Sequence, residues 1–463
     1  MDRWLGAALD YIPSWLDYQT QVAPHSGCLL AVVHRSKVVL ERAYGDANLA
    51  TGEKLTPRHR FRIASHSKSF TSAGILRLRE QRRLRLDDPV GNFVDGLNRK
   101  TARATLAQLL SHSAGLVRDG ADAGQFDERR PYPDADQLKR DLASGPIIDA
   151  GLRLKYSNHG YALLGLVIGA VTGEAYNAWI EREVVGAAGL KETKADMPLK
   201  RGTPFARGHS TDFLLGERLV IPGTYRTNTI AAAGGFVSTA ADTALFFNQL
   251  APTARHSILS ASSRREMVRQ HWRNPHSSIE GYYGLGIMSG AIGGWPWFGH
   301  SGGLLGYVSR TVTLPAHDLT VSIMCNAADG WSGFWVDNAV NILRTFATNG
   351  PPSRRVDGWK SRWWGSWGAF DLVPMGNKVL VGMPGMGHPF LDTSEIEVTG
   401  RDSGRVALGN GYANHGETVR RVRNAAGRIV ELWIGGGRGV SRGRVTAELT
   451  RRFGPSKKRK SRR

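Results

Sequence analysis

The chain has only two cysteines in 463 residues, which excludes a disulfide framework. Cys28 and Cys325 each lie in an apolar segment that predicts a strand, and buried reduced thiols are the simplest interpretation. No run approaches 18 uninterrupted apolar residues, so no membrane-spanning helix is predicted. The first ten residues lack a charged lead before a long apolar stretch, so we expect no secretory signal and a cytoplasmic location.

The sequence also lacks metal-binding patterns: it has no His-Glu-x-x-His, no Cys-x-x-Cys and no close cluster of acids with histidine. We therefore expect no metal and no other cofactor. No motif of the common nucleic-acid-binding folds is present, although the formal net charge is +21. Part of this charge lies in the tail 454–463, whose composition predicts disorder. A solubilising end is the simplest interpretation, and an anionic membrane surface or a nucleic acid are the alternative contacts.

What is present is the tetrapeptide Ser65-His66-Ser67-Lys68, which has apolar residues on both sides. If a helix begins here, the side chains of Ser65 and Lys68 share one face and can meet. A serine hydroxyl is a weak nucleophile until a neighbouring base takes its proton. A lysine can be that base when burial lowers its pKa. The same spacing also fits a solvated helix face, so further motifs are needed to distinguish a catalytic pair from an exposed one.

Two further motifs follow along the chain. Tyr156-Ser157-Asn158 precedes an apolar run, so a phenol and an amide can lie at the start of a helix. His300-Ser301-Gly302-Gly303 follows an aromatic segment and predicts a strand end with a turn of small residues. Such a turn lets the backbone approach a ligand closely.

In this order and spacing the three motifs resemble those of the penicillin-recognising serine hydrolases, most closely class C β-lactamases and their esterase and D-aminopeptidase relatives. Residues 109–116 are similar to that family's Leu-Leu-x-His-x-Ser-Gly-Leu turn, with Ala114 in place of the usual serine. Residues 233–242 and 283–286 match two further segments. The resemblance covers about residues 20–345 and implies an α/β (α+β) β-lactamase-like fold, an antiparallel sheet flanked by helices. In that fold the strands of the two cysteines are neighbours.

The resemblance also implies roles for single residues. Ser65 would be the nucleophile that forms an acyl-enzyme, and Lys68 and Tyr156 would share the proton transfers, with either one as the base. Asn158 would orient Lys68 and the substrate. The backbone N–H groups of Ser65 and Gly303 would bind the developing oxyanion. His300, Ser301 and Gly302 are also predicted to lie near the substrate, and His300 stands where many relatives carry a lysine. His112 is expected to be a structural turn residue.

The length favours two domains. We expect a hydrolase domain over 1–348, a C-terminal antiparallel β-barrel-like domain over 356–453, and the tail 454–463. The C-terminal domain resembles the lipocalin-like appendage of some relatives, and a cluster of four tryptophans between 359 and 367 is interpreted as the seam between the domains. Further expectations are helices over 1–22, 65–80, 136–143, 159–188 and 333–347, a hairpin over 27–45, a specificity loop over 117–150, and three strands in 297–329 with breaks at Gly302-Gly303 and at 315–318.

Three classes of function fit these observations. The first is a serine hydrolase that cleaves ester or amide bonds, like an esterase or a D-aminopeptidase. The second is a β-lactamase or penicillin-binding protein, which the expected lack of a secretory signal disfavours because cell-wall substrates lie outside the cytoplasm. The third is a non-catalytic binding descendant, which the intact Ser65, Lys68, Tyr156 and Asn158 disfavour. The expected partner is a small-molecule or peptide substrate, with no specific nucleic acid and no membrane span, and the oligomeric state stays open.

Overall fold

The computed structural model describes residues 2–23, 26–213, 215–274, 280–409 and 413–454. Contacts divide the chain into two compact units, Pro24–Asp337 and Met1–Ala23 together with Asn338–Arg463. This division differs from the expected one, which placed residues 1–22 with the hydrolase domain. The N-terminal helix belongs to the C-terminal unit because Tyr11 donates a hydrogen bond to the Asp371 carboxylate (3.0 Å), and Gln19 packs against the same unit.

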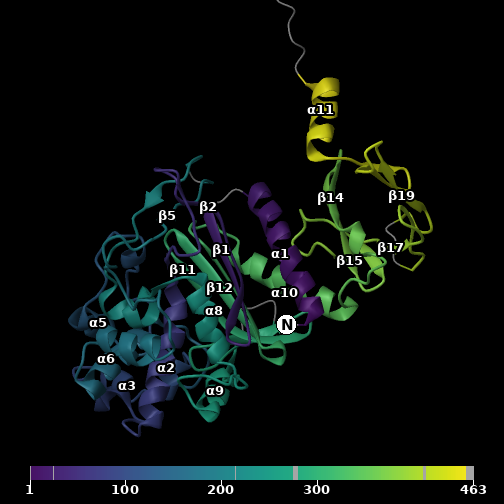
Figure 1. The fold of residues 1–463 in the computed structure, drawn as a ribbon. Helices are drawn as coiled ribbons and strands as arrows, with labels where there is room; N and C mark the ends of the chain where they lie inside the picture. Colours follow the sequence, from purple (N-terminus) through teal and green to yellow (C-terminus); the bar gives the residue numbers. More distant parts are fainter. Residues whose placement is uncertain (1, 24–25, 214, 275–279, 410–412, 455–463) are drawn as a thin grey trace, which may run out of the picture. The chain divides into compact units, whose positions relative to one another are not determined.

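The larger unit is built on an antiparallel sheet with nine described strands (Figure 1). In spatial order these are β3 (Glu53–Lys54), β2 (Lys37–Asn48), β1 (Gly27–His34), β13 (Leu319–Cys325), β12 (Tyr307–Leu314), β11 (Trp295–Leu304), β10 (Met288–Ile292), β9 (Gly281–Tyr283) and β8 (Trp272–Arg273). The predicted hairpin over 27–45 is confirmed by β1 and β2, which join through Arg35 and Ser36 at positive φ. Cys28 and Cys325 lie opposite each other on β1 and β13 as buried free thiols.

Strand β11 corrects one prediction. It continues through Gly302 and Gly303 to Leu304, so the break expected at these glycines is wrong. The chain turns two residues later, at Gly306, whose φ is +82°. Gly302 serves another purpose: a Cβ there would lie 2.2 Å from the carbonyl oxygen of Ile63. Its missing side chain therefore lets the strand lie directly against the segment that carries Ser65.

Helices of the larger unit pack on the sheet and on each other. The described α-helices are α2 (Ser67–Glu80), α3 (Arg99–Ala102), α4 (Leu106–Leu110), α5 (Ala135–Asp141), α6 (Asn158–Thr172), α7 (Tyr176–Ile180), α8 (Ala240–Gln249) and α9 (Ala261–Val268). Helix α8 packs against β1 and β13, and α2 packs against α6. The predicted helices at 136–143 and 159–188 are confirmed, the latter with a break at Gly173, whose φ is +74°. Two short pairs complete the unit: β4 (Phe61–Arg62) with β7 (Val237–Ser238), and β5 (Gly208–His209) with β6 (Val220–Ile221).

No single helix among the described residues is long and apolar enough to cross a membrane, whereas one pair bent by 82°, Asn158–Thr172 with Tyr176–Gly186, meets the criteria of length and composition only.

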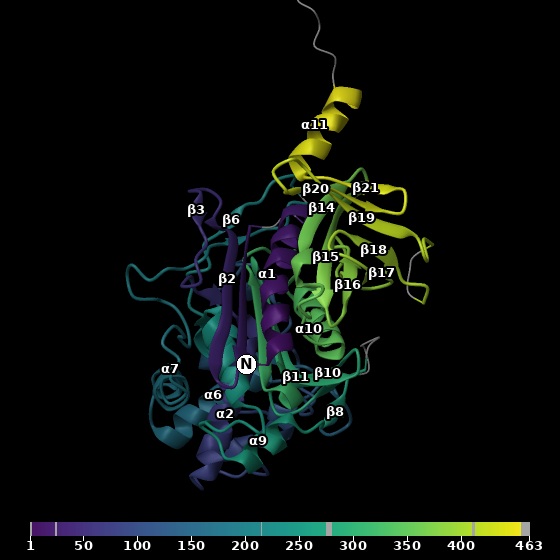
Figure 2. The ribbon, with the colours of Figure 1, turned by 45° about the vertical axis from the view of Figure 1, so that its right-hand side comes forward.

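The smaller unit contains α1 (Arg3–Val22) and a nearly closed, barrel-like antiparallel sheet (Figure 2). Its strands are β14 (Ser361–Gly365), β15 (Gly368–Met375), β16 (Lys378–Gly382), β17 (Glu395–Val398), β18 (Ser403–Val406), β19 (Thr418–Arg423), β20 (Ile429–Ile434) and β21 (Gly437–Gly439). A bridge between Trp364 and Val440 joins the first strand to the end of the last. Trp359 and Trp363 belong to the apolar core of this barrel rather than to a seam between domains.

Two further helices lie near the boundary of the units and after the barrel. Helix α10 (Ser332–Asn349), predicted over 333–347, crosses the boundary between the units. Helix α11 (Arg442–Phe453) follows the barrel and was not predicted. The expected disorder of the tail concerns residues 455–463, which lie outside the described residues.

Candidate functional site

Ser65 lies in a tight turn. The expected helix over 65–80 is present, but α2 begins at Ser67, and Ser65 sits one turn earlier in the 3-10 segment η1 (Ala64–His66). Ala64 takes a left-handed φ of +47°, a conformation that few residues other than glycine adopt. The hydroxyl of Ser67 locks this turn, since it donates to the Ala64 carbonyl (2.6 Å) and accepts from the backbone N–H of Phe236 (3.0 Å). Such strain in a fixed backbone is typical of functional sites.

The ammonium nitrogen of Lys68 has three polar neighbours. It lies 3.1 Å from Ser65 Oγ, 2.7 Å from Asn158 Oδ1 and 2.7 Å from the carbonyl oxygen of Ala233. The spacing of Ser65 and Lys68 therefore brings their side chains together as the sequence predicts. The Ala233 carbonyl belongs to a segment that the sequence singled out, but its contact with Lys68 was missed.

Burial sets the charge of Lys68. Its side chain is fully buried, and this loss of hydration lowers its pKa well below the usual value. The carboxylate of Asp119 opposes the shift and the guanidinium of Arg118 adds to it. The face of the Tyr156 ring lies 4.8 Å from the nitrogen. Burial thus favours the neutral amine of Lys68, the form in which a lysine can accept a proton, and this amine lies next to the hydroxyl of Ser65.

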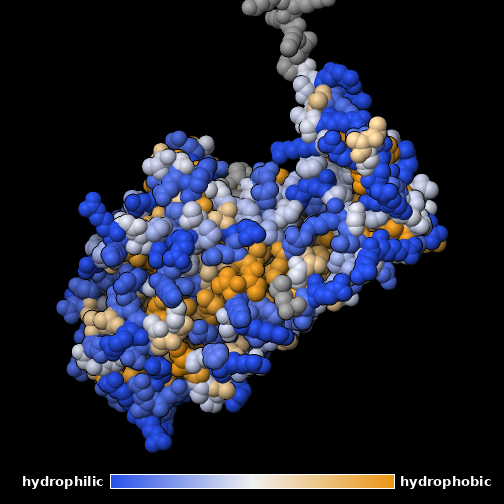
Figure 3. All heavy atoms as spheres, in the orientation of Figure 1, coloured by the Kyte–Doolittle hydropathy of each residue, from blue (hydrophilic) through white to orange (hydrophobic). Residues whose placement is uncertain are grey.

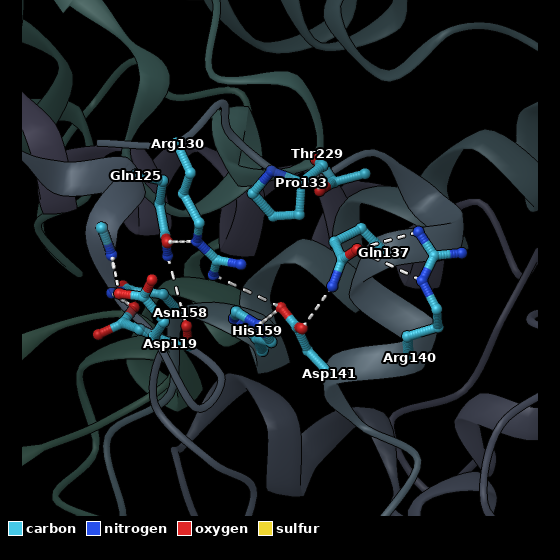
Figure 4. Close-up of polar contacts among 12 residues, drawn as sticks. Asp119, Gln125, Arg130, Pro133, Gln137, Arg140, Asp141, Asn158, His159 and Thr229 are labelled. Carbon is cyan, nitrogen blue, oxygen red and sulfur yellow. Dashed lines mark hydrogen bonds and ion pairs between the residues drawn. The ribbon is translucent and has the colours of Figure 1, made fainter. Parts of the chain in front are cut away.

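Asp119 holds Asn158 in place (Figure 4). The side-chain N–H of Asn158 donates to Asp119 Oδ1 over 2.6 Å, which fixes the amide so that its oxygen points at Lys68. Arg118 forms an ion pair with Asp119 over 3.1 Å. The sequence did not identify Asp119, because no motif marks it. Its place in the predicted specificity loop, two residues after an apolar segment, is the only sequence signal.

The loop over 117–150 is anchored to helix α6 at a second point. His159 Nε2 lies 3.0 Å from Asp141 Oδ2, and Gln137 donates to the other oxygen of that carboxylate over 2.8 Å. Arg130 links Asp141 to Gln125, as Figure 4 shows. The loop predicted to shape specificity is therefore bound to two consecutive residues in the first turn of α6: Asp119 contacts Asn158, and Asp141 contacts His159.

Tyr156 is buried beside Ser65. Burial raises the pKa of its phenol, and a hydrogen bond with the side chain of Ser65 opposes that rise. The ring packs against that of His112, with 4.1 Å between ring centroids and a tilt of 34° between the planes. His112 Nδ1 accepts a hydrogen bond from the backbone N–H of Ser157 (3.1 Å), in a turn where His112 has a φ of +57°. These contacts agree with the structural role expected for His112.

His300 is 2% exposed and uses both ring nitrogens. Its Nδ1 lies 2.7 Å from the carbonyl oxygen of Ser301, which can only accept, so this nitrogen carries the proton. Its Nε2 then accepts from the hydroxyl of Tyr283 over 3.0 Å. Burial first, and then the neighbouring His66 and Lys68, lower its pKa well below the usual value. The imidazole is neutral near pH 7.

The other residues of this motif lie along β11. The hydroxyl of Ser301 accepts a hydrogen bond from Arg310 (3.3 Å). Gly303 is exposed, and the space that a Cβ would fill there is open. Gly302 lies against the Ile63 carbonyl, two residues before Ser65. Strand β11 therefore runs beside the turn that carries Ser65, and the backbone of Gly303 faces open space there.

The burial of His66 should make the free energy of unfolding depend on pH. Its ring is fully buried between the Ile63 carbonyl (3.1 Å) and the Thr311 hydroxyl (3.0 Å), and burial lowers its pKa to about 4. The unfolded chain takes up this proton near pH 6.5, the native chain only near pH 4. The free energy of unfolding should fall by about 3 kcal/mol as pH drops through that window.

Urea denaturation at pH 7, 5 and 4 measures this loss. Because buried His112 and His300 also have lowered pKa values, the wild type should lose more stability than the contribution of His66 alone. His66→Gln should be less stable at pH 7 but should lose less stability on acidification. An equal loss in both proteins would contradict this assignment.

A large antiparallel sheet flanked by helices, with a half-buried Ser65 and a buried Lys68 beside one of its strands, is the β-lactamase-like fold. The chain belongs to the Beta-lactamase family, whose model matches residues 19–358. A D-aminopeptidase of Brucella anthropi is 25% identical over 422 residues, which cover 86% of this chain and 77% of that protein.

Other relatives match over less of their length or show the fold alone. Protein flp of Staphylococcus aureus is 27% identical over 39% of this chain, and the chain spans 38% of the length of that relative. The octameric penicillin-binding protein homologue from Pyrococcus abyssi superposes with a TM-score of 0.67 at 21% identity, over 94% of this chain and all of that one. The D-amino acid amidase from Ochrobactrum anthropi gives 0.63 at 23% identity, over 74% and 99% of the two chains.

Proposed function

We propose that this protein is a serine hydrolase that cleaves ester or amide bonds through an acyl-enzyme on Ser65. The observation that carries the proposal is the 3.1 Å contact between Ser65 Oγ and the buried amine of Lys68. Family membership supports the reaction class, and the D-aminopeptidase relative matches most of the chain.

The hydrogen-bond partners of Lys68 favour it as the base. The Asn158 and Ala233 oxygens can only accept. Lys68 Nζ lies 3.1 Å from Ser65 Oγ. In the proposed base form, a neutral amine would donate its two N–H groups to these acceptors and keep its lone pair for the proton of Ser65. Tyr156, whose pKa is raised, stays protonated and is better suited to donate a proton.

The proposed steps follow from these charges. Ser65 Oγ attacks the substrate carbonyl and its proton passes to Lys68, while the backbone N–H groups of Ser65 and Gly303 bind the oxyanion. The tetrahedral intermediate collapses, and the leaving amine or alcohol takes a proton from the phenol of Tyr156, which Lys68 restores. Water then attacks the acyl-enzyme by the same route and releases the acid.

We propose a substrate without a carboxylate next to the scissile bond. A lysine at position 300 would offer a positive charge, whereas His300 is neutral and bonded to Tyr283. Simple esters and D-amino-acid amides are therefore better candidates than penicillins and cephalosporins. The D-aminopeptidase of Brucella anthropi is consistent with this class.

A substrate panel tests the function. We expect measurable kcat/KM for p-nitrophenyl esters or D-amino-acid amides and at least about tenfold less for a chromogenic cephalosporin, since one lost charge contact is worth roughly 1.4 kcal/mol or more. Faster turnover of the cephalosporin would make the protein a β-lactamase. No turnover of any of them, with Ser65 unreactive, would favour a non-catalytic binding protein.

The same panel tests His300 itself. His300→Lys should tighten the binding of carboxylate-bearing substrates, measured as a lower KM or Ki, and leave neutral esters less affected. His300→Gln is the control, because it keeps a neutral polar side chain and should not favour anionic substrates. If both variants change the two substrate types equally, position 300 does not set the preference for charge.

The pH dependence of kcat/KM tests Lys68 as the base, and two variants should shift it in opposite directions. Only neutral Lys68 can take the proton, so kcat/KM should fall on the acid side with the pKa of Lys68. Asp119→Asn removes a charge that raises this pKa and should move the acid limb to lower pH. Arg118→Gln removes a charge that lowers it and should move the limb to higher pH. Shifts in the same direction would contradict the assignment.

A further inference from the structure

Helix α11 is a basic, amphipathic segment with one apolar stripe. Its sequence holds four arginines and a single glutamate, and none of its side chains is fully buried. Val445, Leu449 and Phe453 are spaced by four residues and so lie on one face. Phe453, at the end of the helix, is 79% exposed. Figure 3 shows hydrophilic side chains over most of the surface of α11, with a few apolar ones among them.

Ion pairs fasten the helix to the barrel near its start and middle. Glu448 pairs with Arg438 of β21 over 3.1 Å, and Arg444 pairs with Glu431 of β20 over 2.9 Å. These pairs use the glutamate of the helix and one of its arginines. Arg451 and Arg452, in the last turn, are exposed beside Phe453.

A second exposed aromatic side chain lies close by. Trp367, in the turn between β14 and β15, is 98% exposed. A cavity of about 920 Å³ has Trp367 and Leu391 in its lining together with Leu449 and Arg452 of α11. Phe370, Val381 and Ile434 line this cavity and also pack against the barrel core, so the cavity lies directly on that core. The turn and the helix therefore form one recess, which we call the α11 recess. Its lining combines apolar side chains with two arginines, Arg438 and Arg452, and two carboxylates, Glu448 and Asp392.

These features fit an interface between water and hydrocarbon. Large apolar side chains gathered on a surface mark a contact site, and tryptophan is enriched where proteins meet the headgroups of a bilayer. A basic amphipathic helix binds such a surface by burying its apolar stripe. The sequence after Phe453 adds Lys457, Lys458, Arg459, Lys460, Arg462 and Arg463, and each such charge favours an anionic bilayer.

We propose that the edge of the α11 recess and the exposed last turn of α11 together bind the surface of an anionic lipid bilayer. Trp367, Leu449 and Phe453 would enter the headgroup region, and Arg451 and Arg452 would pair with lipid phosphates. A nucleic acid would satisfy the arginines, but it offers no hydrocarbon for the aliphatic side chains of the recess. The site would bring a hydrolase to a membrane surface, and it stands whether or not the proposed reaction is correct.

Co-sedimentation of the full chain with vesicles tests this inference. We expect binding to phosphatidylcholine vesicles that contain about one third phosphatidylglycerol, weak binding to pure phosphatidylcholine, and loss of binding at high salt. Arg451→Glu with Arg452→Glu should weaken binding to the anionic vesicles by about 30-fold or more, since each cation contributes about 1 kcal/mol. Lys200→Glu with Arg201→Glu, exposed positions of the other unit, is the matched control and should retain more of the binding.

The apolar half of the site needs its own variants. Trp367→Ala and Phe453→Ser should each weaken binding several-fold, while Trp331→Ala, an exposed tryptophan elsewhere, should not. Brominated lipids should quench wild-type fluorescence more than that of Trp367→Phe. Equal binding of all variants, binding to neutral vesicles alone, or tighter binding of a DNA duplex that survives Trp367→Ala would overturn the proposal.

Discussion

Replacing Ser65 with alanine should lower kcat/KM for the best ester or amide substrate by roughly 10⁴-fold or more, because single losses of a nucleophile in serine hydrolases have effects of this size. The physical reason is that no other hydroxyl takes its place. Ser67 is committed to the Ala64 carbonyl and to the Phe236 N–H, so it cannot turn toward the substrate without breaking the turn.

Ser69→Ala is the control for this experiment. Its hydroxyl donates to the carbonyl of Gly286 (2.6 Å), so the variant loses a buried hydrogen bond of the same kind without touching Ser65. It should keep kcat/KM within about tenfold of the wild type. If Ser65→Ala and Ser69→Ala lose activity equally, damage to the fold explains the loss, and Ser65 has no special part in the reaction.

Lys68→Met and Tyr156→Phe should each slow acylation by roughly 10²- to 10⁴-fold, the usual range for a general acid or base. Methionine fills the buried space of the lysine without its charge. Phenylalanine keeps the ring that packs against His112 and loses only the hydroxyl. Both variants should therefore fold, and a rapid-quench measurement of the acylation burst should show the loss in the chemical step.

The double variant separates a shared proton path from two independent contributions. If Lys68 and Tyr156 pass one proton between them, Lys68→Met with Tyr156→Phe should be scarcely slower than the worse single variant. Losses that multiply would show that the two side chains act independently. A burst unchanged in Lys68→Met would remove it as the base.

The sequence predicted the contact between Ser65 and Lys68 better than the groups that hold the neighbouring side chains in place. Ser65 and Lys68 meet because three residues are close to one helical turn, a local relation that a sequence pattern carries. Asp119 supports Asn158 across 39 positions of chain, and no periodic pattern records such a contact. The Ala233 carbonyl was missed for another reason: every residue has a carbonyl, so only the fold reveals which one faces a lysine.

Contacts between distant residues also limited the prediction of the fold. The sequence predicted a barrel-like domain over 356–453, but it interpreted the tryptophans as a seam between domains, whereas Trp363 of β14 lies in the barrel core. The expected turn at Gly302 and Gly303 failed because glycine serves both turns and close contacts. Here the contact with Ile63 is the reason for Gly302, and the strand continues.

Covalent labelling tests the central claim most directly. The protein is treated with a fluorophosphonate at pH 8, digested, and the modified peptide is sequenced by mass spectrometry. The account predicts a single adduct on Ser65, formed much more slowly in Lys68→Met and absent from Ser65→Ala. An adduct on any other residue, or labelling of Ser65→Ala at the wild-type rate, would contradict it.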